Sequence, residues 1–298
     1  MNDDHEGVPY GKKYRMNGII NIYKERGFTS FDVVAKLRGI CHQKKIGHTG
    51  TLDPDAEGVL PVCIGNATAL CDMLTDKTKE YETVMRLGIT TDTQDISGTV
   101  LTEKDVNLTE ADVISCTEKF TGDIEQIPPM YSAIKVDGKK LYELARQGKT
   151  VERKPRPVTI HSIEVLSVEL PRVRMRISCS KGTYIRTLCH DIGEALSCGA
   201  CMESLLRTRS GQFRIEDAVK LQAVQEWADE GSLEAHLISV EEMFSDCGSL
   251  YINASGDKLL HNGNVISKIC IDHIIEGSKE RYNHSGEVAD IIAFRGPS

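Results

Sequence analysis

Hydrophobic and polar positions follow two different periods along the chain. In residues 81–89 and 173–179 they alternate with a period of two, as in a strand that has one buried face. Residues 18–24 and 158–170 are short runs rich in β-branched side chains. The pattern therefore predicts strands in these four ranges.

A helical period follows the first of these strands. Thr29 or Ser30 can cap a helix that runs through Ile40. Thr109, with Asp112 three residues later, predicts the start of a second helix. The apolar stripe of the first helix is expected to consist of Phe31, Val34, Ala35 and Leu37. Further helices are expected at residues 139–147, closed by Gly148, and at residues 183–196 and 217–230.

The predicted strands and helices do not alternate strictly, which favours an α+β fold with a central, largely antiparallel mixed sheet. A turn-rich segment at residues 244–250 indicates a boundary before a small C-terminal unit. That unit contains three strand-like runs, SLYINA, VISKICI and EVADIIAF, which suit a small β-barrel.

The composition favours a globular protein over a disordered, membrane-spanning or secreted one. The chain has 298 residues, 40% of them hydrophobic, which predicts two domains or one large domain with an appendage and excludes disorder of the whole chain. No apolar run approaches the roughly 18 residues that span a bilayer. The N-terminus is polar and acidic, unlike a signal peptide. We therefore expect a soluble cytoplasmic protein with no membrane partner.

The ten cysteines are expected to be reduced thiols, mostly in the core. Only Cys198 and Cys201 have the C-x-x-C spacing, and no second pair or His pair accompanies them. The sequence thus predicts no metal site.

The formal net charge of −8 conceals a segregation of charge along the chain. Residues 135–156 and 172–190 each carry a net charge of +5, whereas residues 216–246 carry −8. Basic segments that fold onto one face can bind phosphates whatever the total charge. They can equally be ordinary solvated surfaces, and charge alone does not decide between the two.

Residues 44–68, KKIGHTGTLDPDAEGVLPVCIGNAT, are the strongest candidate for chemistry. They contain neither a P-loop nor a dinucleotide fingerprint. His48 and Asp53 could form an acid–base pair, but a lone His and a lone Asp in a glycine-rich stretch are more often turn residues. The residues by themselves leave both interpretations open.

This stretch closely resembles the signature of the TruB family of pseudouridine synthases. The resemblance extends over residues 16–245 in family order, through KEYETVMRLGITTDTQDISG, IPPMYSAIKVDGKKLYELARQG, ERKPRPV, SCSKGTYIRTLCHDIGEAL and LLRTRSGQF. It implies the pseudouridine synthase fold and isomerisation of uridine at position 55 in the tRNA T-arm. The reaction needs no redox change or group donor, so no cofactor is expected.

The resemblance also implies roles for individual residues. Asp53 would be the catalytic carboxylate, Arg186 its ion-pair partner, and Tyr81 the ring that packs on the target base. Whether Asp53 attacks the sugar, attacks the base or abstracts a sugar proton stays open. His48, Tyr184 and Leu205 match further residues of the substrate pocket.

Residues 127–156 match a family insertion that closes on the T-arm. Within it, Lys135, Lys139, Lys140 and Arg146 are expected to contact phosphates. Residues 16–246 would form the catalytic domain and 247–298 a PUA-like RNA-binding domain, degenerate or truncated, while residues 1–15 form an N-terminal extension. The expected partner is tRNA, with no obligatory protein partner and a monomeric state. The alternatives are a guide-RNA-dependent relative and a non-catalytic tRNA-binding or folding helper.

Overall fold

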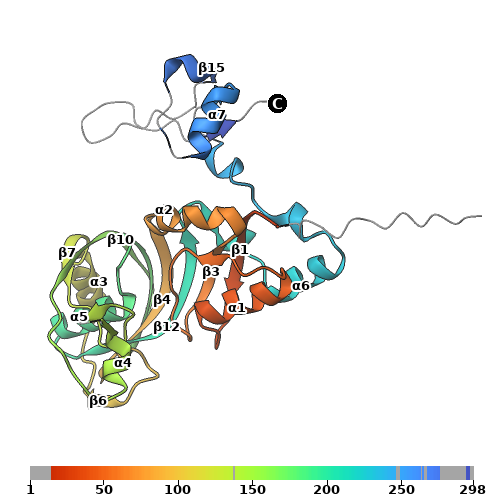
Figure 1. Ribbon diagram of the computed structural model, residues 1–298. Coiled ribbons are helices and arrows are strands. Elements are labelled where there is room, and N and C mark those ends of the chain that lie inside the picture. The colour runs from red at the N-terminus through yellow and green to blue at the C-terminus, as the bar shows by residue number, and fades with distance from the viewer. Residues whose placement is uncertain are drawn as a thin grey trace, which may run out of the picture.

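The computed structural model describes residues 15–136, 138–245, 249–262, 264, 267–275 and 293–295 (Figure 1). Except for Arg15, the N-terminal extension expected at residues 1–15 lies outside these residues.

A long mixed sheet forms the centre of the described chain, in the order β1-β3-β12-β4-β11-β10-β7, with β2 attached to β3 and β13 to β12. Neighbouring strands are antiparallel except for β3 and β12, which run parallel. The expected α+β architecture is confirmed. The strands are β1 (Gly18–Lys24), β2 (Ile46–His48), β3 (Glu57–Ile64), β4 (Lys79–Leu87), β7 (Gly122–Gln126), β10 (Arg156–Glu169), β11 (Arg172–Cys179), β12 (Ala200–Ser210) and β13 (Phe213–Arg214).

The helices cover the two ends of this sheet. α3 and α5 pack on β4, β10, β11 and β12, whereas α1 and α6 pack on β1 and β3 (Figure 1). η1 and α2 cover the other face of β1 and β3. The helices are α1 (Ser30–Ile40), α2 (Cys71–Thr75), α3 (Glu110–Glu118), α5 (Ile185–Ala195) and α6 (Leu221–Asp229), with 3-10 turns η1 (Gly65–Leu70), η2 (Ile215–Asp217), η3 (Leu233–His236) and η4 (Glu242–Phe244).

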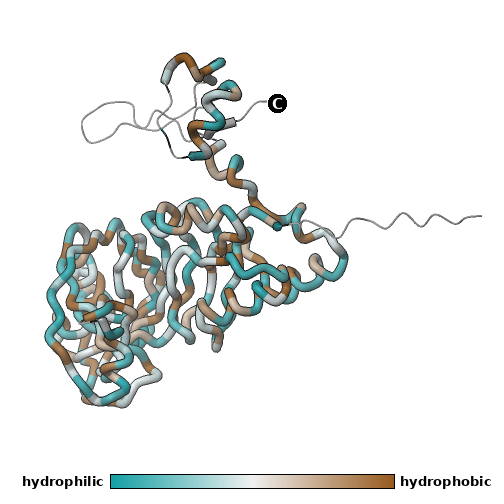
Figure 2. Tube along the Cα trace, viewed as in Figure 1, coloured by the Kyte–Doolittle hydropathy of each residue, from teal (hydrophilic) through white to brown (hydrophobic). Residues whose placement is uncertain are grey.

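Strand β4 shows why the period of two was informative. Tyr81, Thr83, Met85 and Leu87 are all buried, and the intervening residues are only half-buried. On the second face, Glu82 accepts hydrogen bonds from two arginines of the neighbouring strand β11. Over much of the chain, hydrophobic and polar residues are interleaved (Figure 2), whereas β3 is apolar and buried from Gly58 to Ile64. No helix in the described ranges is long and apolar enough to cross a membrane.

Helix α1 begins as expected but buries a different face. Thr29 accepts a hydrogen bond from the Asp32 amide, and the Asp32 carboxylate accepts one from the Thr29 amide. The expected apolar stripe is wrong for Phe31, which is 64% exposed, and for Ala35, which is also exposed. The helix instead packs through Val33, Val34 and Leu37, because its neighbours β1 and α6 lie on that side.

Two small hairpins form two-stranded sheets of their own, apart from the central sheet. β5 (Ile89–Thr91) pairs with β6 (Val100–Glu103), and β8 (Lys135–Val136) pairs with β9 (Lys139–Lys140). The second hairpin occupies the start of the helix expected at residues 139–147. Helix α4 is therefore limited to Leu141–Ala145.

The described part of the C-terminal unit contains a three-stranded sheet in the order β15-β14-β16. The strand expected at residues 265–271 is largely wrong, because Lys268–Cys270 form a 3-10 turn and the strand starts at Ile271. A helix capped by Asn253 was not expected. The elements are β14 (Ser249–Ile252), α7 (Ala254–His261), η5 (Lys268–Cys270), β15 (Ile271–Ile275) and β16 (Ala293–Arg295). Most of the run EVADIIAF lies outside the described residues.

Candidate functional site

Asp53 lies in the loop between β2 and β3, residues 49–56, called here the Asp53 loop. β2 and β3 pair antiparallel, with His48 opposite Val62, so the loop connects two neighbouring strands of the sheet. Within the loop, the Ala56 amide donates to the Asp53 carbonyl at 3.1 Å and closes the turn that contains Pro54. The loop thus presents the Asp53 carboxylate from a short, closed turn.

Helix α1 fixes one side of the Asp53 loop. The Ser30 hydroxyl accepts a hydrogen bond from the Leu52 amide at 2.9 Å, and it lies 3.3 Å from the Leu52 carbonyl. Leu52 itself is buried in the core cluster beneath α5. The residue next to Asp53 is therefore held by both backbone and side-chain contacts.

Two buried cations, Lys24 and Arg207, donate hydrogen bonds to backbone carbonyls of the Asp53 loop. The Lys24 ammonium donates to the carbonyls of Pro54, Phe28 and Glu25 at 3.1, 2.6 and 3.1 Å. Burial lowers the pKa of Lys24 to about 8. Arg207 donates to the carbonyls of Gly50 and Val59 at 3.2 and 2.7 Å. Both side chains are fully buried, so their carbonyl contacts satisfy groups that water cannot reach.

Gly58 allows Arg207 to approach the loop. Its φ is +105°, and a Cβ placed there would lie 2.2 Å from the Arg207 carbonyl oxygen. Only glycine fits both the backbone conformation and the space. The parallel contact between β3 and β12 depends on this close approach, since Gly58 pairs with Arg207.

The Asp53 carboxylate faces Arg186, the second residue of α5. The Arg186 Nε lies 3.0 Å from Asp53 Oδ2, and Nη2 lies 3.2 Å from Oδ1. This two-point contact fixes the plane of the carboxylate as well as its position. The Arg186 side chain is 5% exposed, whereas that of Asp53 is 40% exposed. The arginine is therefore buried in the protein, and the carboxylate remains accessible from solvent.

The remaining Arg186 donors are also engaged. Nη1 donates to the Thr93 carbonyl at 3.1 Å and lies 3.5 Å from an oxygen of Asp95, while Nη2 donates to the Tyr131 carbonyl at 2.9 Å. Burial raises the pKa of Asp53, the positive charge of Arg186 opposes that rise, and the negative charge of Asp95 adds to it. Arg186 therefore favours the ionised form of Asp53 against its surroundings.

Tyr81 and Leu205 lie on adjacent strands, β4 and β12, in the same core cluster as Leu52. Each is 9% exposed. Burial raises the pKa of Tyr81, and the nearby Arg207 charge opposes the rise. The phenol therefore stays protonated at neutral pH, beneath the Asp53 loop.

His48 and Tyr184 are half-buried at two edges of the site. The His48 Nδ1 accepts a hydrogen bond from the Gly50 amide at 3.3 Å, and burial lowers the pKa of the ring, which is therefore neutral at pH 7. Tyr184 precedes α5, and its backbone amide and carbonyl are both bonded by the Gln126 side chain. Burial raises the pKa of the Tyr184 phenol.

The four cations expected to bind phosphates lie on β8, β9 and at the end of α4. Lys135, Lys139 and Arg146 are exposed, and Lys140 is half-exposed. Lys140 and Arg146 flank the Tyr142 ring, each 5.4 Å from its centroid. The insertion of residues 127–156 reaches the site itself through the Tyr131 carbonyl, which binds Arg186.

Three functional contacts were missed by sequence reasoning: Lys24, Arg207 and Asp95. Lys24 ends a predicted strand, and Asp95 falls in a segment interpreted only as turns. No local pattern distinguishes a buried cation from an exposed one. Asp95 had one usable signal, a carboxylate within a family-like block, TTDTQDISG.

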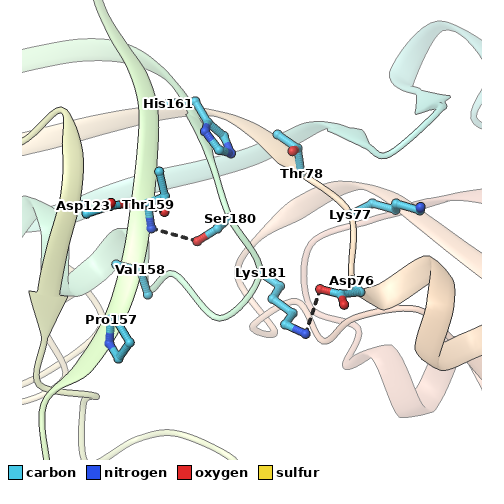
Figure 3. A pocket seen from close by; sticks show the side chains of 10 residues that line it. All are labelled: Asp76, Lys77, Thr78, Asp123, Pro157, Val158, Thr159, His161, Ser180 and Lys181. Atoms are coloured by element: carbon cyan, nitrogen blue, oxygen red, sulfur yellow. Dashed lines mark hydrogen bonds and ion pairs between the residues drawn. The ribbon is translucent and has the colours of Figure 1, made fainter. Parts of the chain in front are cut away.

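A separate cavity of about 500 Å³ lies between β10 and the segments that precede β4 and follow β11 (Figure 3). Lys181, which forms a 2.7 Å ion pair with Asp76, lines it together with His161. None of the site residues expected from the sequence lines this cavity. In the described part of the chain, no group of three or more His, Cys, Asp or Glu could hold a metal.

Two family models match the chain in succession. Residues 38–185 match the model described as TruB family pseudouridylate synthase (N terminal domain). Residues 186–245 match the one described as tRNA pseudouridylate synthase B C-terminal domain. The boundary between the matches falls between Ile185 and Arg186, so Asp53 and Arg186 come from different matched segments.

Curated relatives and solved structures agree with these matches. A protein named tRNA pseudouridine synthase B from Lachnoclostridium phytofermentans is 60% identical over 257 residues, 84% of each chain. One of the same name from Clostridium perfringens (strain SM101 / Type A) is 48% identical over 250 residues, 83% of this chain and 84% of the relative. The structure titled "Crystal Structure of a Cbf5-Nop10-Gar1 Complex" contains a chain 30% identical, with a TM-score of 0.68, that covers 94% of this chain and 74% of its own.

Proposed function

This chain belongs to the TruB family of pseudouridine synthases, and on that premise we propose that it isomerises uridine 55 in the T-arm of tRNA. The observation that supports this most directly is the two-point contact between Asp53 and Arg186, at 3.0 and 3.2 Å. The contact leaves an aimed carboxylate open to a substrate. Relatives named for tRNA support the choice of substrate.

The reaction breaks the N-glycosidic bond of uridine, turns the uracil and joins its carbon 5 to carbon 1′ of the ribose. The carbon 5 proton is lost and a proton is regained at the freed nitrogen, so nothing is oxidised or reduced. We propose Asp53 as the catalytic carboxylate. Attack on the sugar, attack on the base and abstraction of a sugar proton all use the ionised form that Arg186 favours.

Tyr81 is proposed to pack against the target uracil and to accept or return the carbon 5 proton. Because burial raises its pKa, the phenol is protonated at neutral pH, and it must give up its own proton before it can accept the one from carbon 5. His48, Tyr184 and Leu205 are proposed to border the flipped nucleotide. The neutral His48 ring suits contact with an uncharged base.

The insertion of residues 127–156 is proposed to close on the T-arm. Uridine 55 lies in a folded loop, so its base must be flipped to reach Asp53. Such flipping requires contacts outside the pocket, which the exposed cations Lys135, Lys139, Lys140 and Arg146 can make to phosphates. Recognition would rely on the shape of the arm and on unstacked loop bases.

We propose that residues 16–246 act as the catalytic domain and residues 247–298 as an RNA-binding domain of PUA type. The insertion favours a stand-alone enzyme over a guide-RNA-dependent one, because it supplies a basic surface on the chain itself. We further propose that the enzyme is monomeric and cytoplasmic. No cofactor and no obligatory protein partner enter the proposal.

Tritium release from T-arm RNA labelled at uridine carbon 5 tests the function. The wild-type protein should release tritium from position 55, and Asp53→Asn should release none while still binding the RNA. Release mapped to another uridine would overturn the position. Absence of release by a folded wild-type protein that binds the arm would leave a tRNA-binding protein without this activity.

A further inference from the structure

Phe31 is an aromatic side chain that the fold leaves in solvent. It is 64% exposed, and among the exposed large hydrophobic side chains in the described residues it is the only aromatic one. Its neighbours Ser30 and Val33 are buried. The ring therefore contributes little to the core.

The position of Phe31 is fixed relative to Asp53. Phe31 follows Ser30, whose hydroxyl accepts from the Leu52 amide and lies 3.3 Å from the Leu52 carbonyl. Leu52 directly precedes Asp53. Phe31 is thus the chain neighbour of Ser30, and Ser30 bonds Leu52, the chain neighbour of Asp53.

The same face of α1 borders the strand that leads into the Asp53 loop. Arg38 lies two turns after Phe31, and its guanidinium carbon is 5.8 Å from the centroid of the Phe31 ring. Arg38 also donates to the Ile46 carbonyl of β2 at 3.4 Å, two residues before His48. Phe31 and Arg38 therefore share a surface of α1 that reaches β2, the strand before the Asp53 loop.

The charge of this region suits RNA. Residues 33–52 contain Lys36, Arg38, Lys44 and Lys45 and no Asp or Glu. Lys44 and Lys45 are exposed. Asp32, the acid next to Phe31, is held in the cap by Thr29. An exposed ring beside a guanidinium, in a segment rich in cations, matches the chemistry of an unpaired base with its phosphates.

Resting on the function proposed above, we propose that Phe31 is a stacking platform for an unpaired base of the substrate RNA next to the target uridine. Arg38 and the lysines at 44 and 45 would bind the adjoining phosphates. α1 packs at the β1 end of the sheet, and the insertion follows β7, the strand at the other end. The Phe31 surface and the basic surface of the insertion would therefore bind the RNA on either side of Asp53.

The first test compares RNA binding and turnover of Phe31→Ala, Phe31→Leu and Phe31→Trp, with Ile114→Ala as the matched control. Ile114 is exposed on α3, away from β2. Base stacking on an aromatic ring predicts about 10-fold weaker binding and a similar rise in KM for the Ala and Leu variants, with kcat unchanged. The Trp variant should bind like the wild type, and all four should keep the wild-type Tm.

The second test uses T-arm RNAs in which each loop nucleotide beside the target is replaced in turn by an abasic one. One of these RNAs should lose about 10-fold in affinity for the wild type and no longer distinguish it from Phe31→Ala. Equal binding by wild type and both Ala and Leu variants would overturn the proposal. So would a Phe31→Ala defect that persists undiminished on every abasic RNA. Failure of the wild type to modify position 55 would overturn the proposed function separately, since binding is measured without turnover.

Discussion

The Asp53 loop and the insertion of residues 127–156 are built in opposite ways. The loop is held by side chains from elsewhere in the chain, among them the buried Lys24 and Arg207. The insertion is held mainly by its own backbone, as where the Leu141 and Tyr142 amides donate to Ile134 and Ser132. Chemistry needs a group fixed before the substrate arrives, whereas binding a phosphate backbone needs only charges that can reach it.

Among substitutions that keep Asp53 itself, Arg186→Gln should reduce activity the most. The substitution removes the guanidinium that orients the Asp53 carboxylate, and it leaves Asp53 and Asp95 without the cation that they share. The loss in kcat/KM at neutral pH should be about 10³-fold. Arg186→Lys keeps a charge without the two-point geometry and should recover only part of the rate.

The pH profile of Arg186→Gln separates charge from geometry. Burial raises the pKa of Asp53 and Arg186 opposes the rise, so removing Arg186 raises that pKa further. Because the proposed mechanism uses the ionised form, activity should fall as pH drops through this pKa. The acid limb of kcat/KM should therefore lie at higher pH in the Gln variant than in the wild type. An unshifted limb would mean that Arg186 does not set the ionisation of Asp53.

Asp53→Glu tests how strictly the loop positions the carboxylate. The charge is kept, but the longer side chain moves it by about one bond length from the Arg186 fork. A misplacement of about 1 Å should cost about 10²-fold in the single-turnover rate. RNA affinity should stay within about threefold of the wild type, because the proposed phosphate contacts lie elsewhere. A rate close to that of the wild type would show that the loop tolerates movement.

Lys24→Met tests the support beneath the loop. The substitution leaves the carbonyls of Pro54, Phe28 and Glu25 without their buried donor. The free energy of unfolding should fall by about 3 kcal/mol, as measured by denaturant titration. Lys36→Met is the control, because Lys36 is exposed on α1 and should change stability by less than about 1 kcal/mol. Equal losses of stability in the two variants would show that Lys24 does not support the loop.

Local patterns were sufficient for much of the fold. The alternation in β4 and the capping boxes of α1 and α3 depend on residues within a few positions of each other. The exposed face of α1 was not predictable, because its apolar residues form a broad stripe and only the placement of β1 and α6 selects the buried part. Phe31 was assigned to the core for that reason.

The site depends on contacts that no local pattern encodes. Asp53 and Arg186 are 133 positions apart, and only the family resemblance linked them. The residues alone left open an acid–base pair of His48 and Asp53, whereas the His48 ring bonds the Gly50 amide and Asp53 faces Arg186. Lys24 and Arg207 were missed because charged residues normally lie at the surface, and their burial depends on carbonyls from distant segments.

The smallest effects are expected in the insertion. Lys139→Ala or Arg146→Ala removes one exposed charge and no support of the Asp53 loop. Each should raise KM by about threefold and reduce the slope of log affinity against log salt by about one, with kcat and Tm unchanged. Lys119→Ala, at the end of α3, provides an exposed cation outside the insertion as the control. A fall in kcat at saturating RNA would show that the insertion also positions the chemistry, and the contact from the Tyr131 carbonyl to Arg186 is the point through which it would do so.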